Sequence, residues 1–470
     1  MDQKQNRLLK TTFILFVGML GTKLINFIML PFYTNWLSVE EYGTIDIFLV
    51  IISMIVPILT LQLEQGIFRF LIDDKTIDEK KITISSGINV MFFILLIVDV
   101  PALIYIFNFM QKKYLLYLLA INLQCIYVMI QQIARGVGKN KEYSVNSIIL
   151  AFFNLIFCIY FIRYKGLESI GYILAFCIAH FVATIVMVFQ IKASNLISFI
   201  SFSMKKAKEL LKYSIPLIIN NISWWILNAS DKLILNIFCN INANGIYAAA
   251  GKIPNLITTG YSVFHMAWQE SASREKDGNI EGFYSDIFRK LFVFLSFLTI
   301  ILLALGRPLF NILIDSKFYE AYNNLPILIL GMFFLCISQF YGGIYIGMHK
   351  SNSLAITSML AAITNLVIDL LLVKKIGIYA ASISTLISYF LVFFIRYRSL
   401  KKLVRIEYKT KENSIISIII VISFAISYLK NIIISICFAI IISILFLIVY
   451  KELVFEFLKN LKKIVIRHMS

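Results

Sequence analysis

The sequence predicts an all-α polytopic membrane protein of about 14 transmembrane helices, built as two six-helix lobes plus two C-terminal helices. Of its 470 residues, 60% are hydrophobic and 15% are charged, and the mean hydropathy is +0.84. Soluble globular chains carry about 25% charged residues, so much of this chain does not meet water. Apolar runs of about 20 residues, the length that spans a bilayer, follow one another from Thr12 to Tyr450. The short loops between them leave no room for a folded soluble domain.

Each apolar run between two polar loops predicts one helix. The N-terminal lobe, residues 1–200, contains the runs at 12–33, 43–64, 82–108, 113–134, 142–162 and 168–190. The C-terminal lobe, residues 201–411, contains those at 209–238, 245–270, 286–306, 320–348, 352–373 and 377–396. Residues 412–450 contain the last two, at 414–430 and 431–450. The end of the chain, 451–470, alternates apolar and charged residues at helical spacing, which indicates either an amphipathic helix on the cytoplasmic leaflet or a solvated tail.

An internal repeat at an offset of about 200 residues supports the division into two lobes. Lys10 opens the first apolar run and Lys212 opens the seventh, and the stretch Asn154–Phe157 has its counterpart in Asn365–Ile368. An even number of helices in each repeat gives both lobes the same orientation in the membrane.

The net charge of +18 reflects membrane topology rather than affinity for nucleic acid. In the loops and at the helix ends, 32 of the 44 Lys and Arg residues fall on the side shared by both termini and 9 on the other side, and 3 lie inside helices. By the positive-inside rule, both termini and the basic loop Lys192–Lys212 are cytoplasmic.

Two lysines are predicted at bilayer depth, Lys23 in the first helix and Lys252 in the eighth. A charge there costs at least about 2.5–3.5 kcal/mol, so each needs a reason. A cavity lined by both would suit an anionic, phosphate-bearing substrate, which an ammonium attracts as a point charge. The alternative is a pair of structural ion pairs, Lys23–Asp46 and Lys252–Asp231.

Hard oxygen ligands are predicted from three helices of the C-terminal lobe. Asn365 and Asp369 are four residues apart on one helical face, Thr385 lies on the next helix, and Asp231 lies on the seventh. This set suits an alkali cation or a proton relay, and it offers no soft ligand for a transition metal. The six cysteines are scattered singly and have no metal-binding spacing.

The residues of two regions resemble the Wzx-type polysaccharide flippases, which belong to the superfamily of multidrug, oligosaccharidyl-lipid and polysaccharide exporters. The first region is Leu37–Asp46, LSVEEYGTID, followed by Pro57–Phe70, PILTLQLEQGIFRF. The second is Asp231–Leu235, DKLIL, followed by Gly245–Lys252, GIYAAAGK. The resemblance extends over nearly the whole chain.

The resemblance implies two six-helix bundles around a central cavity and alternating access. It implies transport of a polyprenyl-pyrophosphate-linked glycan to the outer leaflet of the bacterial cell membrane, with polymerase or export proteins as further partners. In related lipid II flippases, cationic residues on helices 1 and 8 line the cavity, and Lys23 and Lys252 stand in comparable places. Those flippases also hold sodium at positions that match Asp231, Asn365, Asp369 and Thr385 here, with Ala381 placed to offer its carbonyl. Coupling to Na⁺ or H⁺ is therefore expected. The predicted substrate-binding residues are Lys23, Asp46, Arg69, Trp224, Trp225, Lys232 and Lys252.

Three alternatives remain from the sequence. A cation-coupled multidrug exporter would need an acidic cavity, whereas Lys23, Lys232 and Lys252 are basic. A lipid II flippase would carry an arginine pair on the second helix, where Leu59-Thr60 stands here. A membrane glycosyltransferase or polymerase would need a long outer loop, and the outer loops here are short. The chain is therefore expected not to be an enzyme, and it contains no nucleotide-binding GxxxxGK[ST] loop.

Overall fold

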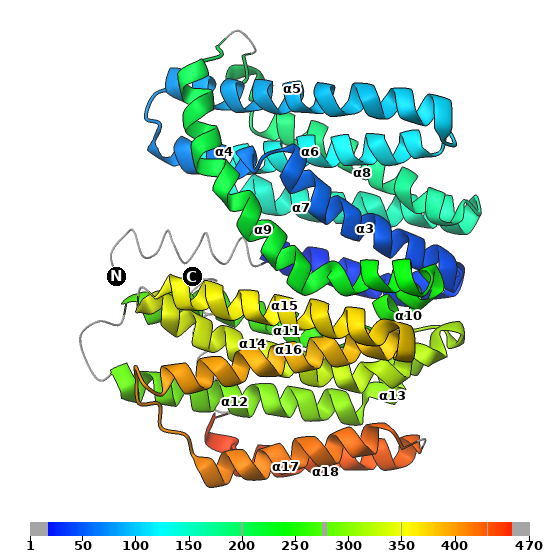
Figure 1. The fold of residues 1–470 in the computed structure, drawn as a ribbon, viewed down its shortest axis with the longest axis vertical. Helices are drawn as coiled ribbons and strands as arrows, with labels where there is room; N and C mark the ends of the chain where they lie inside the picture. Colours follow the sequence, from blue (N-terminus) through cyan, green and yellow to red (C-terminus); the bar gives the residue numbers. More distant parts are fainter. Residues whose placement is uncertain (1–16, 199–200, 275–279, 349, 430, 454–470) are drawn as a thin grey trace, which may run out of the picture. The chain divides into compact units, whose positions relative to one another are not determined.

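The computed structural model describes residues 17–198, 201–274, 280–348, 350–429 and 431–453, and every regular element within these ranges is helical (Figure 1). Eleven of the described helices are long and apolar enough to cross a bilayer. An apolar solvent forces the backbone to satisfy its own hydrogen bonds, and the helix does this within one segment. The predicted all-α polytopic membrane fold is thus confirmed. The predicted amphipathic tail lies outside the described residues beyond 453.

The chain divides into two compact units, Met1–Leu233 and Ile234–Ser470. The boundary falls inside a helix, beyond the boundary at residue 200 that the sequence repeat indicates. The first unit contains a helical segment at residues 17–28 and then α2 (Leu30–Trp36), α3 (Val39–Leu59), α4 (Leu63–Asp73), α5 (Ile77–Phe109), α6 (Tyr114–Gly136), α7 (Asn140–Cys158), the π-helix η1 (Ile159–Tyr164), α8 (Glu168–Gln190), the 3₁₀ turn η2 (Ala193–Asn195) and most of α9 (Met204–Phe238).

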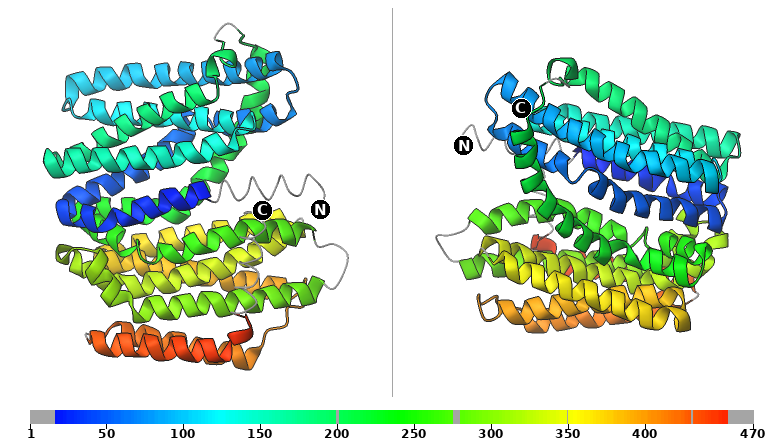
Figure 2. Two further views of the ribbon diagram at one scale, coloured as in Figure 1. Left: turned by 180° about the vertical axis from the view of Figure 1, so that it is seen from behind. Right: turned by 45° about the horizontal axis from the view of Figure 1, so that its top comes forward.

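The second unit takes the last residues of α9 and the remaining helices. These are α10 (Ile241–Ala250), α11 (Asn255–Arg274), α12 (Ile280–Ala304), α13 (Gly306–Leu313), the 3₁₀ helix η3 (Ser316–Asn324), α14 (Leu325–Gly347), α15 (Ser351–Ile376), α16 (Ile378–Leu400), α17 (Thr410–Ser427) and α18 (Ile432–Val449). Within this unit α14 packs against α11 and α16, and α17 and α18 both pack on α12. Figure 2 shows α17 and α18 side by side at one edge of the unit.

The second predicted helix, 43–64, is two helices separated by a sharp break. Helix α3 ends at Leu59, and α4 begins at Leu63 after Leu61 and Gln62 adopt left-handed φ angles of 49° and 54°. Neither residue is glycine, so both hold a conformation that L-amino acids rarely adopt. The backbone therefore turns inside the predicted span, and no glycine stands at Leu61 or Gln62 to indicate such a turn in the sequence.

The eighth predicted helix, 245–270, is broken as well. Helix α10 ends at Ala250, and a tight turn over Gly251–Pro254 precedes α11. Proline lacks an N–H and is disfavoured inside a helix, so the chain leaves the helical path before it. Within the turn, the Gly251 N–H donates to the Tyr247 carbonyl and the Asn255 N–H donates to the Gly251 carbonyl. The break explains why this predicted span does not appear as one long apolar helix.

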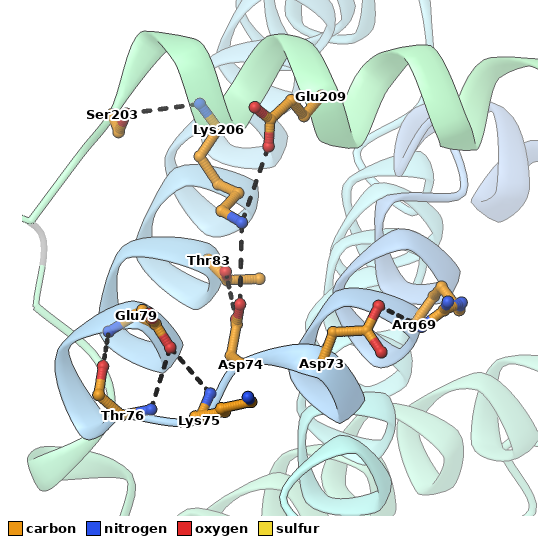
Figure 3. A network of polar contacts seen from close by, with 10 residues as sticks. All are labelled: Arg69, Asp73, Asp74, Lys75, Thr76, Glu79, Thr83, Ser203, Lys206 and Glu209. Carbon is orange, nitrogen blue, oxygen red and sulfur yellow. Dashed lines mark hydrogen bonds and ion pairs between the residues drawn. The ribbon is translucent and has the colours of Figure 1, made fainter.

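A polar network at one end of the first unit ties the start of α9 to the loop between α4 and α5 (Figure 3). The carboxylate of Asp74 accepts a hydrogen bond from Thr83 Oγ1 at 2.6 Å and lies 3.8 Å from the ammonium of Lys206. Ser86 Oγ accepts from the Ser203 N–H at 3.0 Å, which fastens the segment before α9 to α5. The first turns of α9 are therefore held by the first unit.

Candidate functional site

Lys23 lies in the helical segment 17–28 and is half-buried. The segment approaches α7 closely at Gly18 and Gly21. A Cβ atom at Gly18 would lie 2.7 Å from the Ser144 Cβ, and one at Gly21 would lie 3.1 Å from the Ile148 side chain. Small residues at these positions let the helix carrying Lys23 pack directly on its neighbour.

Asp46 and Lys232 form an ion pair within the first unit. The Lys232 Nζ atom lies 2.8 Å from Asp46 Oδ1, and the two side chains are 24% and 7% exposed. The pair joins α3 to α9 across 186 residues of sequence. The structure thus gives Asp46 a partner that the sequence did not suggest, and it largely neutralises one of the predicted substrate-binding cations.

The two neighbouring tryptophans of α9 have different surroundings. Trp225 Nε1 points at the Val50 carbonyl oxygen (3.2 Å) and at Ser53 Oγ (3.1 Å), so its N–H is shared between two acceptors on α3. Trp224 is 41% exposed. Of the two predicted contacts for a sugar or prenyl chain, Trp225 holds α9 against α3, and Trp224 keeps its ring accessible.

Arg69 lies on the short helix α4 and is exposed. Its Nη1 atom forms an ion pair with Asp73 Oδ2 at 2.7 Å, four residues along the same helix (Figure 3). The hydrogen bond and the charge of Asp73 raise the pKa of Arg69. This local pairing occupies the guanidinium that the sequence placed among the substrate-binding residues.

Lys252 lies in the turn between α10 and α11 and is half-buried. Three small residues, Ala248, Ala249 and Ala250, precede this turn and are buried. Non-helical backbone at membrane depth is characteristic of substrate and ion sites in transporters, because exposed N–H and C=O groups become available there. The structure therefore places this lysine at a helix break rather than on a continuous helix face.

A buried polar cluster connects α15 and α16 in the second unit. Asn365 Nδ2 donates to Ser384 Oγ at 3.2 Å, and Ser384 Oγ lies 2.7 Å from Asp369 Oδ1 and 3.0 Å from the Ala381 carbonyl oxygen. Both Asn365 and Asp369 are 1% exposed. The Asn365 Oδ1 atom is buried and has no hydrogen-bond partner within the described residues, so one amide oxygen of the cluster is available to a ligand.

Thr385 belongs to the same cluster, and its Oγ1 atom lies 3.4 Å from the Tyr247 hydroxyl of α10. Four of the five residues predicted to hold a cation, Asn365, Asp369, Ala381 and Thr385, thus lie on two packed helices. The fifth, Asp231, belongs to the first unit, where it is 5% exposed on α9. Among the described residues, no group of three His, Cys, Asp or Glu side chains could hold a metal ion. The cluster instead offers amide, hydroxyl and carbonyl oxygens around one carboxylate.

Two participants of this cluster, Ser384 and Tyr247, were not predicted from the sequence. Ser384 precedes Thr385 in a hydroxyl-rich stretch that also contains Ser382 and Ser388. The composition of α16 therefore indicated further hydroxyl groups near the predicted cation ligands. Nothing in the sequence indicated Tyr247, because its contact with Thr385 spans 138 residues.

Arg396, the last residue of the twelfth predicted helix, is buried inside α16. Its side chain is 4% exposed. The guanidinium donates to Thr357 Oγ1 at 3.0 Å, to the Ser338 carbonyl at 2.8 Å and to Ser358 Oγ at 2.9 Å. It therefore joins α14, α15 and α16 through neutral oxygens.

A family model and a curated membrane protein match parts of this chain. Residues 8–269 match the family model described as polysaccharide biosynthesis protein. An uncharacterized membrane protein of Methanocaldococcus jannaschii is 23% identical over 243 residues, covering 49% of this chain and 47% of that protein. The chain thus matches about half the length of this curated relative.

Two solved structures show the same fold. The lipid II flippase MurJ in an inward closed conformation has a TM-score of 0.72 and 14% identity, over 95% of this chain and 100% of that one. An inward-facing multidrug resistance MATE transporter of the MOP superfamily has a TM-score of 0.64 and 12% identity, over 87% of this chain and 95% of that one. At these identities the likeness establishes the fold.

Proposed function

Because the chain belongs to the polysaccharide biosynthesis protein family and has the fold of the MOP superfamily, we propose that it flips a polyprenyl-pyrophosphate-linked oligosaccharide. Transport runs by alternating access from the cytoplasmic to the outer leaflet of a bacterial cell membrane, with both termini in the cytoplasm. The product serves cell-surface polysaccharide export, with polymerase or export proteins as partners. The protein performs transport and no catalysis.

The observation that carries this proposal is the position of Lys252 at the α10–α11 break. A pyrophosphate brings negative charge into a region of low dielectric constant, where an ammonium is worth far more than in water. Lys23 supplies a second cation in the first unit. We assign substrate attraction to Lys23 and Lys252, the two lysines that the sequence places at bilayer depth.

The coupling ion is Na⁺, held in the second unit by the oxygens of Asn365, Asp369, Thr385 and the Ala381 carbonyl. The unpartnered amide oxygen of Asn365 supports this assignment, because a monovalent cation is held by several neutral oxygens and little excess charge. A bound ion biases the transport cycle only by binding one state of the unit more tightly than the other.

The proposal is tested in proteoliposomes with a fluorescent polyprenyl-pyrophosphate monosaccharide, whose inner-leaflet fraction is protected from a membrane-impermeant quencher. We expect Lys252→Ala to slow flipping about tenfold or more, because it removes a charge interaction worth over 1.4 kcal/mol at low dielectric, and Lys252→Arg to retain it. Lys374→Ala, which removes an exposed lysine at a helix end, is the matched control.

Flipping at the wild-type rate by Lys252→Ala would refute the role given to this charge. Two further arms separate the rival substrates. Faster flipping of lipid II than of the monosaccharide probe would assign the chain to lipid II transport, and efflux of ethidium would assign it to drug export.

A further inference from the structure

A cavity with both polar and apolar lining residues lies within the second unit, where the end of α9, η3 and the α15–α16 turn meet. Its volume is about 430 Å³, within the range of about 300–1,000 Å³ that holds small ligands. The Lys/Arg distribution predicts that this end faces outward. The lining residues are Cys239, Ala243, Glu320, Asn323, Asn324, Ile376, Gly377, Ile378 and Tyr379.

Part of the lining is fixed by contacts behind it. Asn324 is 2% exposed, and its Oδ1 atom accepts a hydrogen bond from Ser382 Oγ at 2.8 Å. The Asn323 carbonyl accepts from the Tyr428 hydroxyl at 3.1 Å. The Ala243 N–H donates to the Asn240 side chain at 2.8 Å. These bonds hold the backbone of η3 and of α10 in place, so the wall of the cavity is preorganised.

Other polar groups of the lining are not engaged. The carboxylate of Glu320 and the side-chain amide of Asn323 make no hydrogen bond or ion pair within the part of the chain that the structure describes. The ring of Tyr379 is 41% exposed. Gly377 has φ +55°, a conformation glycine favours, and nothing lies within 4 Å of the position its Cβ would take. The cavity therefore contains a carboxylate and an amide that can bind a ligand, with open space beside them.

The composition of the lining selects the ligand class. A metal ion would need more than the single carboxylate present, and the described chain has no cluster of three His, Cys, Asp or Glu side chains. A pyranose carries hydroxyls around its edge and C–H groups on its faces. Glu320 and Asn323 can bind the hydroxyls, and Tyr379 with Ile376 and Ile378 can cover an apolar face.

We propose that this cavity is a saccharide subsite, which holds one sugar unit of the glycan at the outer end of the second unit. That the sugar belongs to a lipid-linked glycan rests on the proposed function. The binding of a pyranose in the cavity does not depend on it. Binding there would stabilise whichever state of the transport cycle keeps the cavity open, by the amount of its preference for that state.

Cys239 provides a native reporter, because it lines the cavity and is only partly buried, while Cys125, Cys158, Cys177 and Cys336 are buried. Cys437, whose side chain is exposed, is replaced by serine. The full chain is placed in lipid nanodiscs, and the rate of alkylation of Cys239 by N-ethylmaleimide is measured with a panel of methyl pyranosides. At about three times its Kd, a bound sugar slows the reaction about fourfold.

Protection by at least one pyranoside, lost in Glu320→Gln and Asn323→Ala, is the expected result. The control Asn311→Ala removes an exposed amide of α13 outside the cavity lining and should keep the protection. Equal protection by open-chain sorbitol, protection by CaCl₂ in place of sugars, or no protection by any pyranoside would overturn the subsite. A protein that shows sugar protection but fails to flip the lipid-linked probe would refute the proposed function and leave the subsite standing.

Discussion

Removal of one partner of the Asp46–Lys232 ion pair should destabilise the first unit strongly. Asp46→Asn leaves an ammonium that is 24% exposed beside a neutral amide. Breaking a buried pair in this way typically costs 3–5 kcal/mol, and we expect about 3 kcal/mol because the partly exposed lysine can move its head toward water. For a unit of this size, that loss corresponds to a fall in melting temperature of about 6–12 °C.

The pairing itself is tested by a double variant. Asp46→Asn combined with Lys232→Gln removes both charges and both desolvation costs, so it should recover most of the lost stability. Arg69→Gln is the control, since it breaks an exposed ion pair of the same unit and should leave the melting temperature unchanged.

Thermal unfolding in nanodiscs, followed by tryptophan fluorescence, provides the measurement, and Trp225 reports directly on the α3–α9 contact. Two results would refute the reasoning: a single variant that melts like the wild type, or a double variant that melts no higher than Asp46→Asn. Either result would show that the ion pair between Asp46 and Lys232 does not stabilise the first unit.

Three further predictions follow from the second unit and from the topology. Sodium should raise the melting temperature of the wild type more than potassium or choline does, and Asp369→Asn should abolish that difference; an equal response to all three salts would exclude the site. Arg396→Gln should cost about 3 kcal/mol, because the bonds from the buried guanidinium to Thr357 and its other neutral partners are lost; a melting temperature within 2 °C of the wild type would contradict this. In a background without exposed native cysteines, Lys208→Cys should resist an impermeant thiol reagent on intact cells, whereas Lys374→Cys should react; the reverse pattern would invert the predicted topology.

The sequence predicted the all-α membrane fold and the position of most apolar helices, because hydropathy indicates which segments can lie in lipid. The sixth predicted helix, 168–190, is α8, which spans Glu168–Gln190 as predicted. The break at Leu61 and Gln62 was not predictable, since neither residue type favours the left-handed conformation that both adopt. Tertiary packing overrides local preference there.

The candidate site was predictable only in part. Asn365 and Asp369 follow from helical spacing, and their place beside α16 follows from the order of helices. The partner of Asp46 could not be predicted, because a contact across 186 residues leaves no trace in a single sequence. The role of Arg396 was not predictable either, because an arginine at the end of an apolar run resembles a basic loop residue and only packing shows it to be buried.

The attachment of α9 to the first unit has a consequence for how the protein is divided. By the repeat in the sequence, α9 opens the second lobe. By its contacts through Asp74 and Ser86, its first turns are bound to the first unit. The border drawn by the repeat, at residue 200, and the border drawn by the contacts, near residue 233, therefore differ, and the second lies within a continuous helix. A truncation at residue 200 would separate α9 from the residues that hold its first turns.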